Sequence, residues 1–126
     1  MQRKLIAFGA VLSVSAGLAL AAVELDTDLM QNIDDTNKSL ASNIALKDGK
    51  AAIADAKSMN TMFDTVETYF VQKGDAANAV DLTKKSRELT LTIVNAVTSN
   101  DFDKATDAAT TLSRTCKTCH TFYKKE

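Results

Sequence analysis

The absence of proline is the feature that most restricts what this chain can fold into. Proline is a strong helix breaker, and without it the turn signals after residue 22 are confined to three segments, 47–49, 73–75 and 99–101. These segments combine residues that favour turns or helix caps, with Asp75 and either Asn100 or Asp101 as candidate N-caps. They recur about every 26 residues. The spacing predicts four helices of similar length, over about 24–46, 50–72 and 76–98 and from 102 onward.

Apolar residues recur every three or four positions within these stretches, which places them on one face of a helix. The expected inner faces are Leu25, Leu29, Met30, Ile33, Leu40 and Ile44 in the first helix, Ile53, Ala56, Phe63, Val66 and Phe70 in the second, and Val80, Leu82, Leu89, Ile93 and Ala96 in the third. Short connections make neighbouring helices antiparallel. The sequence therefore predicts an all-α fold, an antiparallel up-down-up-down four-helix bundle.

The last stretch has the strictest periodicity. Phe102, Ala109, Cys116 and Tyr123 repeat every seven residues, with Ala105, Leu112 and Cys119 between them. This pattern places both cysteines of the chain on the stripe that faces the bundle interior.

Residues 1–22 have the features of a secretory signal peptide. Arg3 and Lys4 precede an uncharged apolar run, and small residues around Ala21 suit cleavage after Ala21 or Ala22. The run is short for a membrane span, which needs roughly 20 apolar residues. We therefore expect export to the periplasm and one mature domain over 23–126.

The mature part carries no sign of nucleic-acid or membrane binding. Without Arg3 and Lys4 the formal net charge falls from −1 to −3, and no basic run is present. No second apolar stretch is long enough to span a membrane. No acid–base pair or substrate site is recognisable, so we do not expect an enzyme.

Cys116, Cys119 and His120 form a C-x-x-C-H motif, Cys-Lys-Thr-Cys-His, which is the attachment signature of c-type haem. On a helix, residues i, i+3 and i+4 share one face, so both thiols can reach the vinyl groups on one edge of the porphyrin. The adjacent His120 is then directed at the iron from the same face. The motif predicts one covalent haem c, with its iron bound by His120.

Three other uses of these residues are less favoured. A disulfide between Cys116 and Cys119 would close a very small loop. Zinc would need a fourth ligand, and the chain has no further Cys or His. A thioredoxin-like dithiol belongs at a strand-to-helix junction, which an all-helical chain lacks. A haem-free bundle with an exposed dithiol stays open as the structural alternative.

The sixth coordination position of the haem iron is either occupied by a methionine or open. Met30 lies near the start of the first helix, which an up-down bundle brings beside the end of the fourth. Met59 and Met62 should lie roughly 9–14 Å further from His120 along the bundle axis, at ~1.5 Å per residue. We therefore expect Met30 to be the sixth ligand, and Met59 and Met62 to fill the core.

Aromatic and basic residues near the motif are weaker candidates for haem contact. Phe63, Phe70, Phe122 and Tyr123 either wall the haem or form ordinary core. The haem edge could be ringed by Lys117, Lys124 and Lys125, and Arg114 could reach a haem propionate. The alternative is that all four residues belong to a solvated charged face.

These motifs give the chain a recognisable resemblance. Its C-terminal motif and four helices resemble the class II c-type cytochromes, that is, cytochrome c-prime and its low-spin relatives. The chain is also similar to the periplasmic four-helix-bundle cytochrome b. Residues 25–40 match the first helix of those proteins, and the resemblance implies that Met30, in the Leu29-Met30 pair, is an axial ligand.

Two functions follow as expectations. The first is a periplasmic electron-transfer protein with His/Met ligation, which exchanges electrons with redox partner proteins. The second is a cytochrome c-prime-like protein whose open, five-coordinate site binds nitric oxide or carbon monoxide. The sequence leaves open whether the protein is a monomer or a homodimer.

Overall fold

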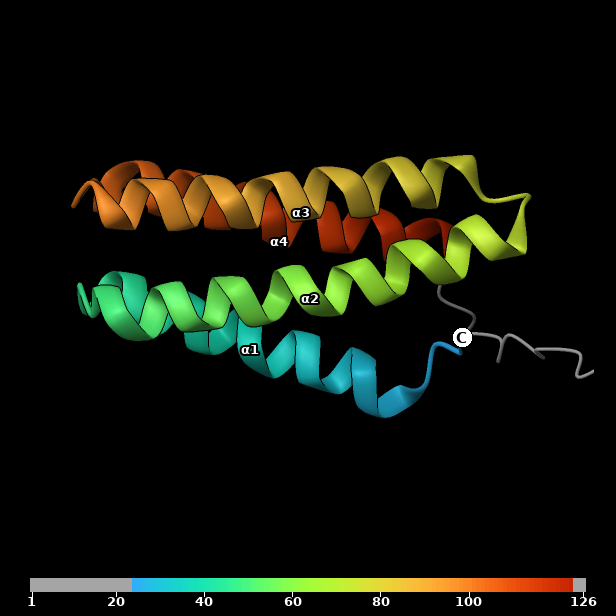
Figure 1. The fold of residues 1–126 in the computed structure, drawn as a ribbon, viewed down its shortest axis with the longest axis horizontal. Coiled ribbons are helices and arrows are strands. Elements are labelled where there is room, and N and C mark those ends of the chain that lie inside the picture. The colour runs from blue at the N-terminus through green and yellow to red at the C-terminus, as the bar shows by residue number, and fades with distance from the viewer. Residues whose placement is uncertain (1–23, 124–126) are drawn as a thin grey trace, which may run out of the picture.

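The computed structural model describes residues 24–123, so the predicted signal peptide at 1–22, Lys124 and Lys125 lie outside the described residues. Four helices follow one another along this part of the chain: α1 (Thr27–Ala45), α2 (Gly49–Lys73), α3 (Ala77–Thr98) and α4 (Phe102–Tyr123). They lie side by side in Figure 1, joined by short turns at alternating ends. The predicted all-α class is confirmed, and the predicted helix ranges agree to within about three residues.

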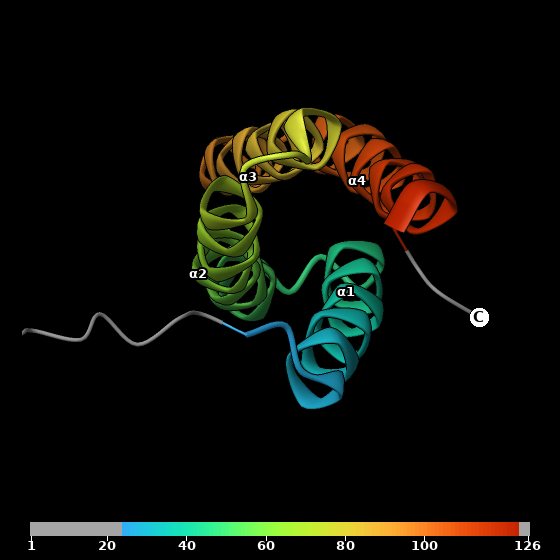
Figure 2. The same cartoon turned by 90° about the vertical axis from the view of Figure 1, so that its right-hand side faces the viewer.

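The helices form an up-down bundle in which each packs against its neighbours in sequence and α1 also packs against α4. Figure 2, viewed along the bundle, shows the helices arranged around a common centre, with α1 closing the ring beside α4. Of the four neighbouring pairs, α1 and α4 pack least extensively. Their free ends, the start of α1 and the end of α4, diverge at one end of the molecule. No helix among residues 24–123 is both long and apolar enough to cross a membrane.

The core follows the predicted faces of α1, α2 and α4, although Leu25, Leu29, Met30 and Ile53 are only half-buried. Leu40 of α1, Met59 of α2 and Leu112 of α4 are fully buried. Burial of Met59 confirms that it fills the core, and Met62 packs against the core with partial burial.

The inner face of α3 differs from the prediction. Ile93 and Ala96 are buried as expected, but Val80, Leu82 and Leu89 are only half-buried. The remaining buried positions of α3 are Val97 and four small or hydroxylated residues, namely Ala79, Thr83, Ser86 and Thr90. Thr83 and Ser86 donate hydrogen bonds to carbonyls three or four residues earlier in their own helix. A hydroxyl that is satisfied in this way can be buried, although a hydropathy pattern counts it as polar.

Two of the three turns place a residue other than glycine in the left-handed conformation. Lys47 and Asn100 adopt left-handed backbone conformations after α1 and α3, with φ of 56° and 58°. The next residue in each case, Asp48 or Asp101, donates its backbone N–H to the carbonyl five residues earlier, as in a Schellman motif. Gly49 is instead the first residue of α2, where an added Cβ would lie only 3.3 Å from Val97 Cγ1.

The caps also differ in one place. Asp101 accepts a hydrogen bond from the Lys104 N–H and caps α4 as predicted. Asp75 is not the N-cap of α3, because that position is Ala76, which has no side chain able to cap. The Tyr123 hydroxyl, from the last turn of α4, instead accepts the Ala79 N–H of the first turn of α3 at 3.2 Å. A residue distant in sequence therefore satisfies a backbone donor that is normally satisfied locally.

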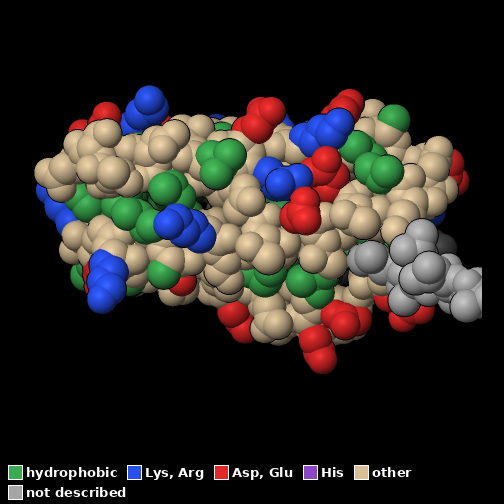
Figure 3. Space-filling view, in the orientation of Figure 1, with side chains coloured by type: hydrophobic (Ala, Val, Ile, Leu, Met, Phe, Trp, Pro, Cys, Tyr) green, Lys and Arg blue, Asp and Glu red, His purple; other side chains and the backbone are tan. Residues whose placement is uncertain are grey.

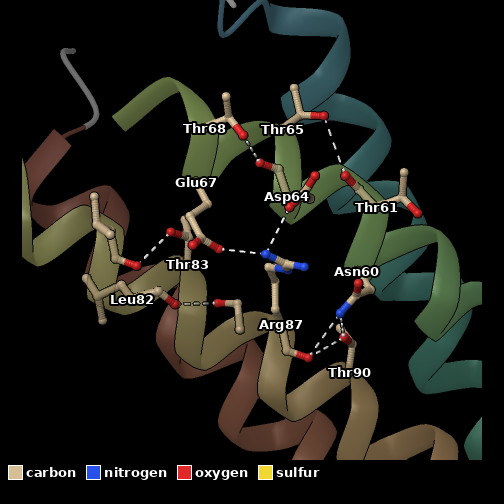
Figure 4. Close-up of polar contacts among 12 residues, drawn as sticks. Asn60, Thr61, Asp64, Thr65, Glu67, Thr68, Leu82, Thr83, Arg87 and Thr90 are labelled. Atoms are coloured by element: carbon tan, nitrogen blue, oxygen red, sulfur yellow. Dashed lines mark hydrogen bonds and ion pairs between the residues drawn. The ribbon is translucent and has the colours of Figure 1, made fainter. Parts of the chain in front are cut away.

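Polar side chains tie α2 to α3 across the surface. Figure 4 shows Arg87 of α3 between Asp64 and Glu67 of α2, at 2.9 and 3.0 Å. Asn60 of α2 donates to the Arg87 carbonyl and to the Thr90 hydroxyl. On the other side of the bundle, acidic side chains gather along the edge formed by α1 in Figure 3, where Asp28, Asp34 and Asp35 are exposed.

Candidate functional site

A cavity of about 610 Å³ lies at the end of the bundle where α1 begins and α4 ends. This volume is within the range of about 300–1,000 Å³ that is typical of ligand and cofactor sites. All four helices contribute to its lining, and most of the lining is apolar. Cys116, Cys119, His120 and Met30, the four residues singled out from the sequence, all line this cavity.

The two thiols lie one turn apart on the inner side of α4. Cys116 and Cys119 are half-buried and are not joined in a disulfide. Burial raises the pKa of the Cys116 thiol to about 11, and the nearby Cys119 and Asp34 add to the effect. Burial also raises the pKa of Cys119. Both thiols therefore stay protonated at neutral pH, unlike the thiolates of reactive redox dithiols, whose pKa is lowered.

His120 follows directly after Cys119 in the last turn of α4. Its side chain borders the cavity, although the residue as a whole is exposed. His120 thus lies at the rim of the cavity.

Met30 lines the same cavity from the neighbouring helix, α1. It is the fourth residue of α1, and His120 is the fourth residue from the end of α4. Since the two helices run antiparallel, both residues lie about one turn from the same end of the bundle. Met59 and Met62 do not line the cavity.

Apolar side chains form most of the cavity wall. Ile33, Phe63, Val66, Phe70, Leu82 and Tyr123 line it. Of the four aromatic candidates, Phe63, Phe70 and Tyr123 therefore face the cavity, whereas Phe122 does not line it and is 63% exposed. Arg114 and Lys117 are exposed and are also absent from the lining.

Several polar lining residues were not anticipated from the sequence. Thr83 and Ser86 of α3 and Thr115 of α4 line the cavity, and each donates its hydroxyl proton to a carbonyl of its own helix. Gln31, Asp34 and Asn37 line it from α1. The repeat of apolar residues could not reveal these three residues. Asp34 and Asn37 follow Met30 by four and seven positions, however, and this spacing places them on the Met30 side of α1.

The donor set suits a haem better than a bare metal ion. In the described part of the chain, no group of three or more His, Cys, Asp or Glu side chains is arranged to hold a metal. The cavity instead combines two unpaired thiols, one imidazole and one thioether with an apolar wall. These are the groups that covalent attachment and axial ligation of a haem require.

Comparison with protein-family models, with curated proteins and with solved structures gives no match for this chain.

Proposed function

We propose that this protein is a periplasmic c-type cytochrome that transfers single electrons between redox partner proteins. One haem would be attached through Cys116 and Cys119, with His120 and Met30 as axial ligands of its iron. The observation that carries the proposal is that the C-x-x-C-H motif and Met30, which are distant in sequence, line one cavity of suitable size.

The haem would supply the one-electron chemistry, and the residues of the chain would set the conditions for it. Thioether bonds keep the cofactor in a small exported protein. The apolar wall formed by Phe63, Val66, Phe70 and Leu82 would pack against the haem and limit its contact with water. A methionine sulfur opposite histidine raises the reduction potential. A helical bundle whose core residues are fully buried, as Leu40, Ile93 and Leu112 are here, changes little in shape between oxidation states.

The finer family assignment belongs to the same proposal. The four-helix fold and the position of the haem motif at the end of α4 support a place among the class II c-type cytochromes and their low-spin relatives. The Leu29-Met30 pair in the first turn of α1 supports the low-spin group in particular.

A five-coordinate, gas-binding protein is the second candidate. It is favoured by the limited packing between α1 and α4, because a loosely held α1 would leave Met30 away from the iron. Carbon monoxide or nitric oxide would then have access to the open coordination position.

The first experiment tests haem attachment. The full chain, exported to the periplasm, should yield a product whose intact mass exceeds that of the cleaved chain by one haem. The haem should resist extraction with acid and acetone. Haem that extracts freely, or a product without haem, would overturn the proposal.

The second experiment decides between the two candidates. Wild-type protein should show a six-coordinate, low-spin spectrum and bind carbon monoxide slowly. Met30→Ala should become high spin, bind carbon monoxide quickly and have a lower reduction potential. Met59→Leu is the matched control, because Met59 is buried away from the cavity. A wild-type protein that is already high spin and binds carbon monoxide freely would establish the gas-binding alternative.

A further inference from the structure

The contact between α1 and α4 depends on one polar link. Asn37 Nδ2 of α1 donates a hydrogen bond to Ser113 Oγ of α4 at 3.1 Å, in partly buried surroundings. Among residues 24–123, no other hydrogen bond or ion pair joins these two helices. The α1–α2 pair has two such links, from Ser39 and Asn43 of α1 to Asp55 of α2, and the α2–α3 pair has more.

Packing does little to support this link. The large cavity includes Asn37 in its lining, and a second cavity of about 140 Å³ includes Ser113. The hydrogen bond therefore stands between two poorly filled regions along the α1–α4 contact. This pair of helices also packs less extensively than the other neighbouring pairs.

The same link fixes the register of the two helices. Asn37 is paired with Ser113. In antiparallel helices, a step toward the start of one corresponds to a step toward the end of the other. Two turns, or about 10.5 Å, along each helix lead from Asn37 to Met30 and from Ser113 to His120. A seven-residue step keeps nearly the same helical face. The residues at the two proposed axial positions are thus held level by the pair two turns below them.

We propose that Asn37 and Ser113 are positioning residues, whose hydrogen bond holds α1 in the register and proximity that keep Met30 on the haem iron. The inference rests on the proposed His/Met ligation. When the bond is broken, the first turns of α1 move away from α4 more often, and the sixth position opens. The pair therefore sets the balance between a closed electron carrier and an open gas-binding site.

Ser113→Ala is the cleanest test, because it removes the acceptor without changing the lining of the large cavity. A single hydrogen bond of ordinary strength biases such an equilibrium by about two- to tenfold. The rate of carbon monoxide binding to the ferrous variant should rise by that factor. Hydrogen exchange of backbone amides 27–36 should accelerate similarly, while haem content stays the same.

Two further variants separate positioning from a general loss of stability. Ser113→Thr retains the hydroxyl, and the adjacent 140 Å³ cavity has room for its methyl group, so it should behave as wild type. Ser42→Ala makes the same substitution at an exposed position of α1 and should also behave as wild type. In the double variant Asn37→Ala/Ser113→Ala, the effects of the two changes on amide exchange should not add.

The outcomes distinguish this inference from the function on which it rests. If wild-type haem is low spin but Ser113→Ala binds carbon monoxide at the wild-type rate, the positioning role is wrong and the cytochrome proposal stands. An equal acceleration in Ser42→Ala also overturns the positioning role. A wild-type protein that is already high spin overturns both the His/Met ligation and this inference.

Discussion

On the proposed function a haem fills the cavity, so producing residues 23–126 in the cytoplasm, where haem is not attached, should leave the cavity end of the bundle unpacked. The opposite end contains the fully buried side chains of Leu40, Ile93 and Leu112 and does not depend on a cofactor. At the cavity end, Met30, Phe63 and their neighbours have only the cavity on one side. The two ends should therefore differ in order in the haem-free chain.

The size of the effect follows from the cavity. At ~24 cal/mol per Å³, a volume of about 610 Å³ would destabilise the fold by about 15 kcal/mol if it stayed empty and unrelaxed. The whole stability of a domain of this size is only about 5–15 kcal/mol. Because the cavity opens to solvent, water entry and inward movement of α1 reduce the loss. A loss of several kcal/mol is still expected, enough to abolish cooperative packing around the cavity.

Thermal unfolding and thiol alkylation would measure this loss. The haem-free chain should melt broadly and at a lower temperature than the haem-loaded protein. In the packed structure, burial raises the pKa of Cys116 to about 11, so few thiolates exist at pH 8 and alkylation is slow. In the haem-free chain, opening of the cavity end should lower the pKa of Cys116 toward its ordinary value. Alkylation at pH 8 should then be faster than in a chain whose cavity end is packed.

A haem-free chain that melts sharply at the temperature of the haem-loaded protein, with thiols that resist alkylation, would refute this reasoning. It would mean that the four helices hold the cavity open without help. The haem would then bind to a preformed site without contributing to the stability of the fold.

Three substitutions test the fold itself. Leu112→Ala, at a fully buried position, should lower the free energy of unfolding by about 2–5 kcal/mol in urea titrations, and an unchanged midpoint would contradict the described core. Tyr123→Phe should lower it by about 1 kcal/mol, because the Ala79 N–H loses its acceptor while the ring contact with Phe70 remains. Gly74→Ala should lower the melting temperature, because φ at this position is 82°, although nothing lies within 4 Å of the added methyl group.

The helices and their order could be predicted because the signals are local. A proline-free chain with three turn segments leaves few alternatives, and heptad spacing identified the inner face of α4 from Phe102 to Tyr123. Met59 was correctly assigned to the core by its distance from the chain end. These predictions need only the period of a helix and the direction of its neighbours.

What the sequence did not predict depended on partners distant in sequence or on polar side chains that are satisfied within their own helix. Asp75 looked like the cap of α3, yet Tyr123 of α4 satisfies the first turn of that helix. Thr83 and Ser86 were not among the predicted inner-face residues of the third helix, yet internal hydrogen bonds allow their burial in the cavity wall. The Asn37–Ser113 link joins residues 76 positions apart, and no local pattern indicates it.

The position of the site follows from the topology. In an up-down bundle of four helices, turns connect α1 to α2, α2 to α3 and α3 to α4, but no turn connects α4 back to α1. This pair is therefore held by side chains alone and is the one that can separate to admit a large flat cofactor. The chain places its cysteines and histidine at the free end of α4 and Met30 at the free end of α1. Chemistry that requires two residues on opposite sides of a haem is thus best located at this contact. The strength of the Asn37–Ser113 link can adjust how closely α1 approaches α4 there without changing the core.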